Sequence, residues 1–323
     1  MRAASVTRYG PPERIVISEI PLPEPRQGEA LVRVEAAAVT AADARLRAGR
    51  FPQGFGLLAR LGIGFRGPRA RVLGSAFSGR IESVAPGEMR FAPGDEVAGM
   101  NGLRMGAHAE YMTVRTQKLV RKPDELSHED TAGVLFGGAT ALWFLRDRAG
   151  VKSGDRVLIN GASGAVGSSA VQLARYLGAT VTAVTSSRNR DLAVRLGAGR
   201  VLDYEEVPVA TIDDHFDVVF DAVGNLSRSE GLRLLVPTGS LLLAVASLFD
   251  TVRARGRVHA GPAPERGDDF AFLLDLVVRG DLDTVTEVVG GLERVREAHR
   301  RIDTGRKVGN LVILPQVKED AAQ

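Results

Sequence analysis

The stretch Val157–Gly167, VLINGASGAVG, is the part of the sequence that decides the fold. It is a short apolar run that stops at a glycine-rich turn, and the residues that follow, VGSSAVQLARYLGA, have the spacing of an amphipathic helix. The unpaired N–H groups and the positive dipole end at the start of a helix bind phosphate groups well. The stretch therefore predicts a strand, a phosphate-binding turn and a helix, in that order.

Each glycine of this turn meets a different steric requirement. Gly161 allows the tight turn after the strand, Gly164 removes a Cβ that would collide with a phosphate, and Gly167 lets the helix lie against the sheet. Ala162 stands in place of the usual first glycine, which gives the pattern A-x-G-x-x-G. No Gly-Lys-Ser/Thr follows, so a nucleoside triphosphate loop is excluded. We interpret the turn as a dinucleotide site, and a glycine-rich turn without a function is the alternative.

The strand-and-helix pattern repeats after this turn. Thr180–Thr185 predicts a second strand, Asp191–Leu196 a helix, Arg200–Tyr204 a third strand and Phe216–Phe220 a fourth. Strands that alternate with helices form a parallel, doubly wound sheet. The fold class expected is therefore α/β, with a Rossmann domain.

A second domain is expected because 323 residues are too many for one Rossmann unit. Residues 1–122 carry short alternating strand patterns between turn-rich segments, which favours an antiparallel, barrel-like domain. Leu126–Leu145 changes to a helical pattern capped by Ser127, and Pro264–Gly280 is a second capped helix. We therefore expect a barrel-like domain over 1–122, a Rossmann domain over 123–265, a return to the first domain over 266–316 and a tail over 317–323.

Composition excludes several classes of site and partner. The chain has no cysteine, so disulfides, thiolate nucleophiles and cysteine-bound zinc are absent. Its N-terminus lacks the apolar core of a signal peptide, and no apolar run approaches the roughly 18 to 20 residues of a membrane helix, so a cytoplasmic protein without a membrane partner is expected. The net charge is only +3, which indicates no nucleic-acid surface. The arginines of residues 45–71 fit a solvated face, although that segment could also line an anionic partner.

Several motifs, in their order along the chain, resemble one family. They are GEALVRVEAAAVTAADARLRAG, VLGSAFSGRIESVAPGEMRFAPGDEVAG, HAEYMTV, FGGATALWFL, the glycine turn, VLDY, FDVVFDAVGN and EAHRRIDTGRKVGNLVI. Together they resemble the medium-chain dehydrogenase/reductase superfamily, and within it the zinc-free quinone oxidoreductase group, which is zeta-crystallin-like. The resemblance spans nearly the whole chain and implies a GroES-like, barrel-like catalytic domain and a Rossmann domain, with nicotinamide and substrate meeting in the cleft between them.

The resemblance also implies that no metal is used. Zinc-dependent relatives place Cys and His ligands in the catalytic domain, whereas this chain has Thr40, Ser75 and Thr140 at those positions. The lobe that holds structural zinc in such relatives is missing as well. Thr40 and Thr140 become candidate pocket residues whose hydroxyls could bind the carboxamide or a substrate oxygen, and buried hydroxyls satisfied by backbone are the alternative. No strong general acid presents itself.

The end of the second strand bears on which nicotinamide cofactor binds. NAD-preferring Rossmann folds place an acid there, whereas this chain has Thr185, Ser186, Ser187 and Arg188, which favour a 2′-phosphate. Tyr204 matches a second phosphate or adenine contact by resemblance, or it only caps its strand. The cofactor is expected to be NADPH, held by Gly161, Ser163, Gly164, Ala165, Val166, Gly167, Thr185, Ser186, Ser187, Arg188, Tyr204, Ala222, Val223, Gly309 and Asn310.

These features predict an NADPH-dependent, zinc-independent reductase of quinones or α,β-unsaturated carbonyl compounds. The alternative is a protein that keeps the fold without net redox turnover, as a biosynthetic cyclase or isomerase or as a cofactor-binding module. Two departures from the family motivate it: Ala76 replaces a usual acid, and the segment DTVTEVVGGL lacks an Asp-Arg pair common in close relatives. Relatives commonly dimerise through the edge of the Rossmann sheet, here Leu241–Ala260, so a homodimer is expected.

Overall fold

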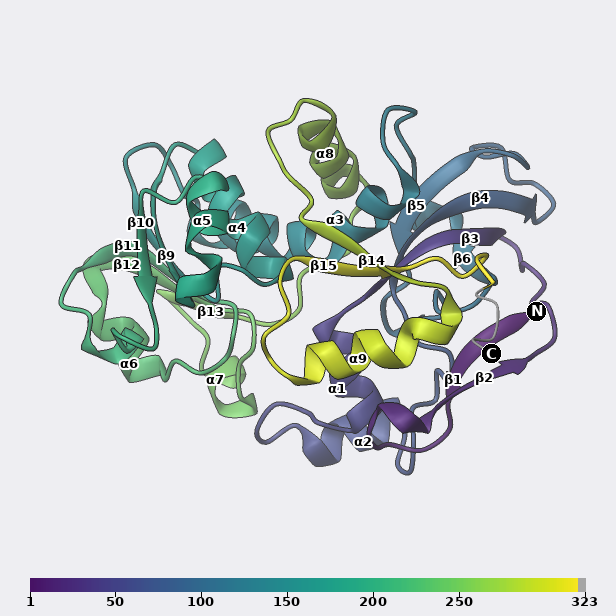
Figure 1. Ribbon diagram of the computed structural model, residues 1–323, viewed down its shortest axis with the longest axis horizontal. Coiled ribbons are helices and arrows are strands. Elements are labelled where there is room, and N and C mark those ends of the chain that lie inside the picture. Colours follow the sequence, from purple (N-terminus) through teal and green to yellow (C-terminus); the bar gives the residue numbers. More distant parts are fainter. Residues whose placement is uncertain (319–323) are drawn as a thin grey trace.

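The glycine turn follows β8 (Arg156–Asn160), a central strand of the parallel sheet that occupies the left part of Figure 1. The figure shows the computed structural model, which describes residues 1–318. Six strands of the described chain form this sheet in the order β10-β9-β8-β11-β12-β13, and every neighbouring pair is parallel. This is the strand order of a doubly wound nucleotide-binding fold, and the predicted fold class is confirmed. The strands are β8 (Arg156–Asn160), β9 (Thr180–Thr185), β10 (Arg200–Asp203), β11 (Phe216–Asp221), β12 (Leu235–Leu243) and β13 (Val258–Ala260).

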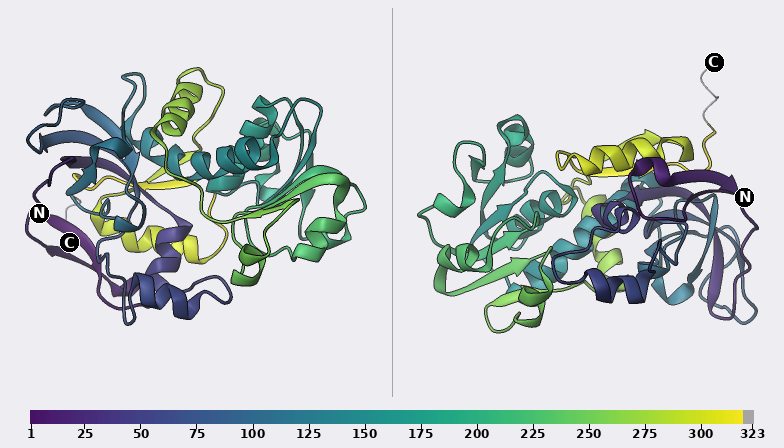
Figure 2. Two further views of the ribbon diagram at one scale, coloured as in Figure 1. Left: turned by 180° about the vertical axis from the view of Figure 1, so that it is seen from behind. Right: turned by 90° about the horizontal axis from the view of Figure 1, so that it is seen from below.

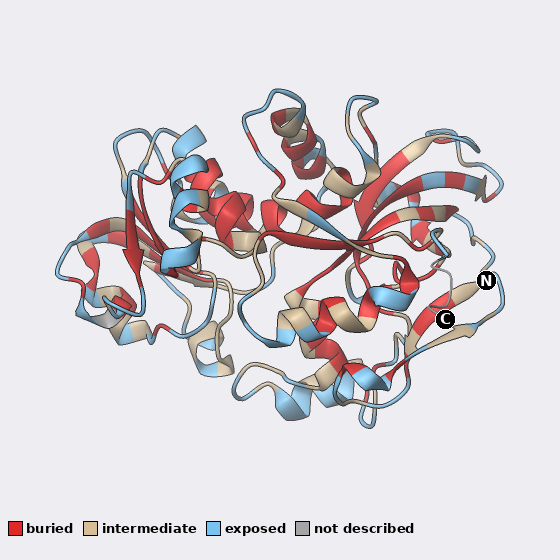
Figure 3. Ribbon diagram, in the orientation of Figure 1, coloured by how far each residue is buried: buried red, intermediate tan, exposed pale blue. Residues whose placement is uncertain are grey.

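Helices cover both faces of this sheet, and their apolar sides form its core (Figures 1 and 3). Val157, Ile159, Ala170 and Phe220 are among the side chains that are fully buried there. Burial of a side chain such as Val or Phe contributes about 1.5–3 kcal/mol to folding. The helices of this part are α3 (His128–Leu142), with a π-helical turn at Trp143–Ala149, α4 (Ala165–Tyr176), α5 (Arg190–Arg195), α6 (Arg228–Arg233), α7 (Leu248–Val252) and α8 (Gly267–Val278).

A second sheet forms the other domain and draws on both ends of the chain (Figure 2). Its order is β14-β15-β3-β4-β5-β7, with β6 also paired to β3, and all its pairs are antiparallel except β14 with β15. The strands are β3 (Glu29–Val39), β4 (Ala76–Val84), β5 (Glu96–Met100), β6 (Tyr111–Arg115), β7 (Leu119–Arg121), β14 (Thr286–Gly290) and β15 (Asn310–Ile313), beside the hairpin of β1 (Arg2–Val6) and β2 (Ile15–Glu19).

Strand β15 joins the last part of the chain to the first domain, because Leu311–Ile313 pairs with Ala37–Val39 of β3. Within the return to the first domain that was expected over 266–316, the structure has β14, α9 (Val295–Asp303) and β15. The sequence TEVVG of β14 does not alternate regularly between apolar and polar residues. The local sequence therefore did not predict a strand that pairs with β15. The tail expected over 317–323 lies outside the described residues from 319 onward.

Two helices of the first domain, α1 (Ala41–Ala48) and α2 (Gly56–Ile63), follow β3, and α1 packs against α9. Thr40 and Asp43 form a capping box at the start of α1, each side chain bonding the other residue's backbone N–H. The guanidinium of Arg47 is fully buried between the helices and donates to Asp303 at 2.6 Å. This ion pair fixes α1 to α9. Short 3₁₀ turns lie at Pro12–Arg14, Gly102–Arg104, Thr116–Lys118, Ser187–Asn189, Val209–Thr211 and Leu292–Arg294.

His299 of α9 is a buried titratable group in this contact. It is fully buried beside His108 and Arg47, and neither ring nitrogen has a hydrogen-bond partner in the described part of the chain. Burial holds the pKa of His299 well below 6.5, and the nearby His108 and Arg47 lower the pKa further. The folded state therefore keeps His299 neutral at a pH where the unfolded chain binds a proton.

We expect this difference to make the fold acid-sensitive. Below about pH 6.5 the free energy of unfolding falls by up to about 1.4 kcal/mol per pH unit through His299 alone, and its contribution is constant above that pH. Urea unfolding between pH 5 and 8 measures the slope for the wild type, for His299→Gln and for the exposed control His215→Gln. The slope should decrease only in His299→Gln, and an unchanged slope in that variant would contradict the assignment.

Candidate cofactor site

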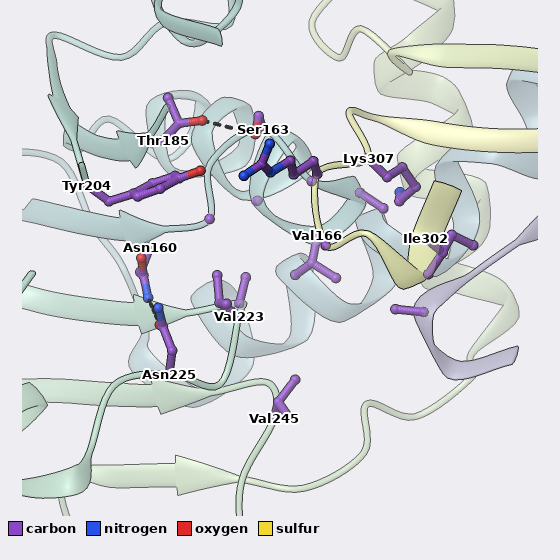
Figure 4. Close-up of a pocket in the computed structure, with 18 of the residues that line it drawn as sticks. Asn160, Ser163, Val166, Thr185, Tyr204, Val223, Asn225, Val245, Ile302 and Lys307 are labelled. Atoms are coloured by element: carbon purple, nitrogen blue, oxygen red, sulfur yellow. Dashed lines mark hydrogen bonds between the residues drawn. The ribbon is translucent and has the colours of Figure 1, made fainter. Parts of the chain in front are cut away.

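A cavity of 790 Å³ lies between the two domains, at the carboxyl ends of the central strands (Figure 4). The Rossmann side supplies the glycine turn and the ends of β8, β9 and β11, and the other domain supplies α1, the loop after it and the segment after α9. The carboxyl edge of a doubly wound sheet is where such folds bind nucleotides. Of the expected cofactor contacts, those that line the cavity are Gly161, Ser163, Gly164, Ala165, Val166, Gly167, Thr185, Ser186, Arg188, Tyr204, Ala222 and Val223.

The glycine turn leaves open space at the start of α4. Gly164 is the N-cap of α4, and no side chain caps the N–H groups of the first turn. A Cβ on Gly164 would meet only the Gly161 carbonyl oxygen, at 3.7 Å, whereas a Cβ on Gly167 would lie 2.0 Å from that same oxygen. Gly167 is thus required by close packing, and Gly164 opens into the cavity. An uncapped helix start behind a glycine fits a phosphate group.

Ser163 holds the turn in place through side-chain and backbone contacts. Thr185 at the end of β9 donates to the Ser163 hydroxyl at 3.0 Å, and Asn189 donates to it at 3.1 Å (Figure 4). From the opposite domain, the Gly309 N–H donates to the Ser163 carbonyl at 2.8 Å. Thr185 and Gly309 were expected as cofactor contacts, and the structure places both as supports of the turn. Ser187, Gly309 and Asn310 do not line the cavity, and Asn310 donates to the Thr284 carbonyl.

The loop after β9 presents hydroxyls and a guanidinium to the cavity. Ser186 is buried and Arg188 is exposed, and both line the cavity near Tyr204. Asp203, at the end of the neighbouring strand β10, accepts from the backbone N–H groups of Glu205 at 2.9 Å and Ser187 at 2.7 Å. These hydrogen bonds hold the pKa of Asp203 below its usual value. This carboxylate, which the sequence analysis did not single out, orders the loop and lies outside the cavity lining.

A second carboxylate orders the loop after β11, where Ala222 and Val223 reach the cavity. Asp221 is fully buried and accepts from the N–H groups of Val223, Gly224 and Leu226. The amide of Asn160 on β8 donates to both Asp221 and Asn225. Sequence reasoning missed the link to Asn160 because that residue lies 61 positions before Asp221 in the chain.

Comparisons with known proteins agree with this geometry. A family model described as "Alcohol dehydrogenase GroES-like domain" matches residues 26–124, and one described as "Zinc-binding dehydrogenase" matches residues 196–313. The chain is similar to the chloroplastic quinone-oxidoreductase QR1 of Triphysaria versicolor, with 28% identity over 92% of this chain and 93% of that protein. Its fold is similar to that of the quinone oxidoreductase from Coxiella burnetii, with a TM-score of 0.87, 27% identity and coverage of 98% of this chain and 99% of the other.

The chain belongs to the medium-chain dehydrogenase/reductase superfamily, in its quinone oxidoreductase group. The expected family is thereby confirmed, and the family places the chain among oxidoreductases that use a nicotinamide cofactor. A further similar structure is mycobacterial Rv1454c complexed with NADPH, with a TM-score of 0.80, 27% identity and coverage of 98% of this chain and all of that one.

Three residues that the sequence analysis matched to zinc ligands of relatives carry hydroxyls, and the structure shows where these hydroxyls lie. The Thr40 hydroxyl donates to Asp43 at 2.6 Å, and that of Thr140 donates to the Phe136 carbonyl at 2.8 Å. The buried Ser75 hydroxyl has no partner in the described chain. Neither Thr40 nor Thr140 lines the cavity. Across residues 1–318, no group of three His, Asp or Glu side chains is arranged to hold a metal ion.

The other domain contributes cations to the cavity of this medium-chain reductase. Arg45 and Arg50 reach it from α1 and the following loop, and Arg306 and Lys307 reach it from the segment after α9. None of the four has a carboxylate partner within residues 1–318, and the Lys307 ammonium donates to the Gly309 carbonyl. Burial lowers the pKa of Lys307 to about 8, and the charge of Arg301 adds to this effect. Sequence reasoning missed Arg306 and Lys307 because nothing local links them to the glycine turn.

Proposed function

We propose that the protein is an NADPH-dependent, zinc-independent reductase that delivers hydride to a quinone or an α,β-unsaturated carbonyl compound. The observation that carries the proposal is the uncapped start of α4, which opens into a cavity where the end of β9 presents Thr185, Ser186 and Arg188. This arrangement fits a dinucleotide with a 2′-phosphate. The NADPH complex of the similar mycobacterial protein supports the choice of cofactor.

The residues of this chain would divide the work as follows. The turn of Ser163 and Gly164 would bind the pyrophosphate, Ser186 and Arg188 would bind the 2′-phosphate, and Val223 would limit the nicotinamide end. When bound, reduced nicotinamide supplies the hydride. The protein would orient the acceptor beside it and exclude water, and holding two reactants in the correct geometry accelerates a reaction between them.

The side chains that stand in place of metal ligands indicate which kind of acceptor the enzyme can reduce. Thr40, Ser75 and Thr140 offer hydroxyls where zinc enzymes offer thiolate and imidazole, so these side chains cannot form the usual metal site that polarises a carbonyl. An acceptor that is already electrophilic, such as a quinone or an activated enone, needs no such polarisation. The name of the similar relative from Triphysaria versicolor supports a quinone.

A kinetic assay tests this function. NADPH oxidation is followed in a stopped-flow instrument with a panel of quinones and enones, with and without a chelator. The proposal requires turnover with at least one acceptor that is insensitive to the chelator. Formation of product without consumption of NADPH, or binding of NADPH without any turnover, would favour the non-redox alternative. Loss of turnover on chelation would indicate a metal-dependent enzyme and contradict the proposal.

Lys307 would add positive charge opposite the glycine turn, and its pKa of about 8 gives this role a pH dependence. Lys307→Met should weaken NADPH binding about tenfold at pH 7, since a hydrogen bond to a charged group is worth about 1.5–3 kcal/mol and 1.4 kcal/mol is a factor of ten. In the wild type, affinity should decrease as the pH rises through 8, because the ammonium loses its charge. Isothermal titration calorimetry at pH 7 to 9.5 measures the NADPH affinity of Lys307→Met and of the wild type, with the exposed Lys152→Met as the control. An equal pH dependence in Lys307→Met and wild type would refute the role.

We also propose a cytoplasmic homodimer. The strand β13 is the edge of the parallel sheet in the described chain, and its backbone groups on the outer side are available for pairing with a second copy. Analytical ultracentrifugation of the purified protein measures the oligomeric state, and a monomer at micromolar concentration would contradict the dimer.

A further inference from the structure

Helix α2 and the turn after it expose four large apolar side chains on the surface beside the cavity. Leu57, Leu58, Leu61 and Phe65 are 68%, 57%, 61% and 64% exposed, and no residue of α2 is buried. Leu57, Leu61 and Phe65 follow one another at four-residue intervals, so Leu57 and Leu61 share one face of the helix. Large apolar side chains that are exposed together on a folded protein mark an interaction site.

Helix α7 of the Rossmann domain extends this surface. Phe249 and Val252 are 58% and 76% exposed. The start of α7 adjoins the loop before α2, because the Leu248 N–H donates to the Gln53 carbonyl at 2.8 Å, and Figures 1 and 2 show both helices at the same edge of the molecule. We call this surface the apolar shelf: Leu57, Leu58, Leu61, Phe65, Phe249 and Val252.

Specific contacts fix the shelf in position. The Tyr9 hydroxyl donates to the Gly64 carbonyl at 2.6 Å, and its N–H donates to the Arg66 carbonyl. Arg69 donates to the carbonyls of Leu61 and Gly62, both at 3.1 Å, which satisfies the last turn of α2. The exposed apolar side chains are therefore presented by a helix that is anchored to the domain.

The rim of the shelf carries positive charge. Residues 44–81 contain eight arginines and no Asp, Glu or Lys. An acidic residue next to Phe249 in the sequence is Asp250, whose carboxylate accepts a hydrogen bond from the Ser247 hydroxyl at the start of α7. The exposed arginines of this segment and of the residues that follow α7 have no carboxylate partner in the described chain. They are Arg50, Arg60, Arg66, Arg69, Arg71, Arg253 and Arg255.

We infer that the apolar shelf docks the protein on an anionic lipid surface, with Leu57, Leu61, Phe65 and Val252 entering the interface and the arginines contacting lipid headgroups. An amphipathic segment with apolar and arginine-rich sides lies in the plane of a membrane interface in this way. Each arginine near an anionic surface contributes about 1 kcal/mol. A second copy of the chain is a poorer occupant, because it would bring the two arginine rims together, and the proposed dimer uses the β13 edge of the parallel sheet instead.

This inference departs from the expectation of no membrane partner, which considered spanning segments. None of the helices in residues 1–318 has the length and apolar character to cross a bilayer, so the interaction is confined to the surface. The shelf also borders the cavity, since Arg50, Phe51 and Pro52 line the cavity just before α2 begins. Docking would bring this edge of the cavity toward the lipid.

Vesicle sedimentation tests the inference without reference to catalysis. Wild-type protein is mixed with phosphatidylcholine vesicles or with vesicles that also contain phosphatidylglycerol. We expect at least roughly tenfold stronger binding to the anionic vesicles at low salt, decreasing steeply at high salt. Leu57→Gln/Leu61→Gln/Phe65→Gln should lose this binding. The control Met89→Gln/Leu103→Gln changes side chains that are 95% and 75% exposed elsewhere and should bind like wild type.

A second pair of variants separates charge from fold. Arg66→Gln/Arg71→Gln should weaken binding to anionic vesicles at least several-fold and flatten its salt dependence, whereas Arg115→Gln/Arg175→Gln, exposed arginines on other surfaces, should not. Circular dichroism confirms that each variant is folded. Failure of the wild type to bind anionic vesicles, or equal binding by the shelf variants and their controls, would overturn the inference. So would a wild-type dimer that the triple variant converts to a monomer, because the shelf would then be covered by a second copy.

Discussion

Replacing Gly164 by valine is expected to weaken NADPH binding by about 100-fold while the protein stays folded. The backbone of Gly164 is extended, with φ −78°, so that any residue can adopt it. A Cβ there has one neighbour in the described chain, the Gly161 carbonyl oxygen at 3.7 Å, so the added side chain would point into the cavity. Valine would keep a phosphate away from the N–H groups at the start of α4. Calorimetric titration with NADPH and thermal unfolding without it measure the two effects.

Two further glycines give this experiment its controls. Gly199→Val lies in the same domain, where a Cβ would meet ordinary contacts at 3.8 Å, and it should bind NADPH like wild type. Gly167→Val should instead lower the melting temperature, because its Cβ would lie 2.0 Å from the Gly161 carbonyl oxygen. If Gly164→Val binds NADPH with wild-type affinity, the start of α4 is not the phosphate site.

The second large effect concerns the choice between NADPH and NADH. Arg188→Glu should weaken NADPH binding roughly 10- to 100-fold, because it replaces a hydrogen bond to a charged group worth about 1.5–3 kcal/mol by repulsion of the 2′-phosphate. The affinity for NADH, which lacks that phosphate, should change little. The ratio of the two dissociation constants is the measurement. Arg190→Glu is the matched control, since Arg190 is exposed two residues away and does not line the cavity. An unchanged ratio in Arg188→Glu would show that the cofactor choice is made elsewhere.

The central part of the fold could be predicted because its signals are local. The β-branched runs and the glycine turn predicted the bounds of β8, β9, β10 and β11 to within one or two residues. These bounds could be predicted because each run is short and bounded by turn residues. The helices α3 and α8 were predicted for the same reason, but the cap expected for α8 was wrong, because Arg266 precedes the helix and makes no side-chain cap.

The remaining features depend on contacts between distant parts of the chain. Strand β14 exists because it pairs with β15, and its own five residues carry no strand pattern. The supporting roles of Thr185 and Gly309 follow from hydrogen bonds to Ser163 that span 22 and 146 positions. The burial that lowers the pKa of Lys307 is likewise a product of the assembled cleft. Sequence could name residues near the site, and only the fold distinguishes those that line the cavity from those that support it.

The hydrogen bond from the Gly309 N–H to the Ser163 carbonyl also implies that the cofactor site is completed late in the synthesis of the chain, because Gly309 follows the whole parallel sheet in the sequence. A chain folds from its N-terminal part first as it is made, and the parallel sheet can form once residue 260 is available. The wall of the cavity that contains Ile302 and Lys307 is added only by the last part of the sequence. Nucleotide is therefore not expected to guide the early steps of folding, and its stabilising effect should appear only when the whole described chain has been assembled.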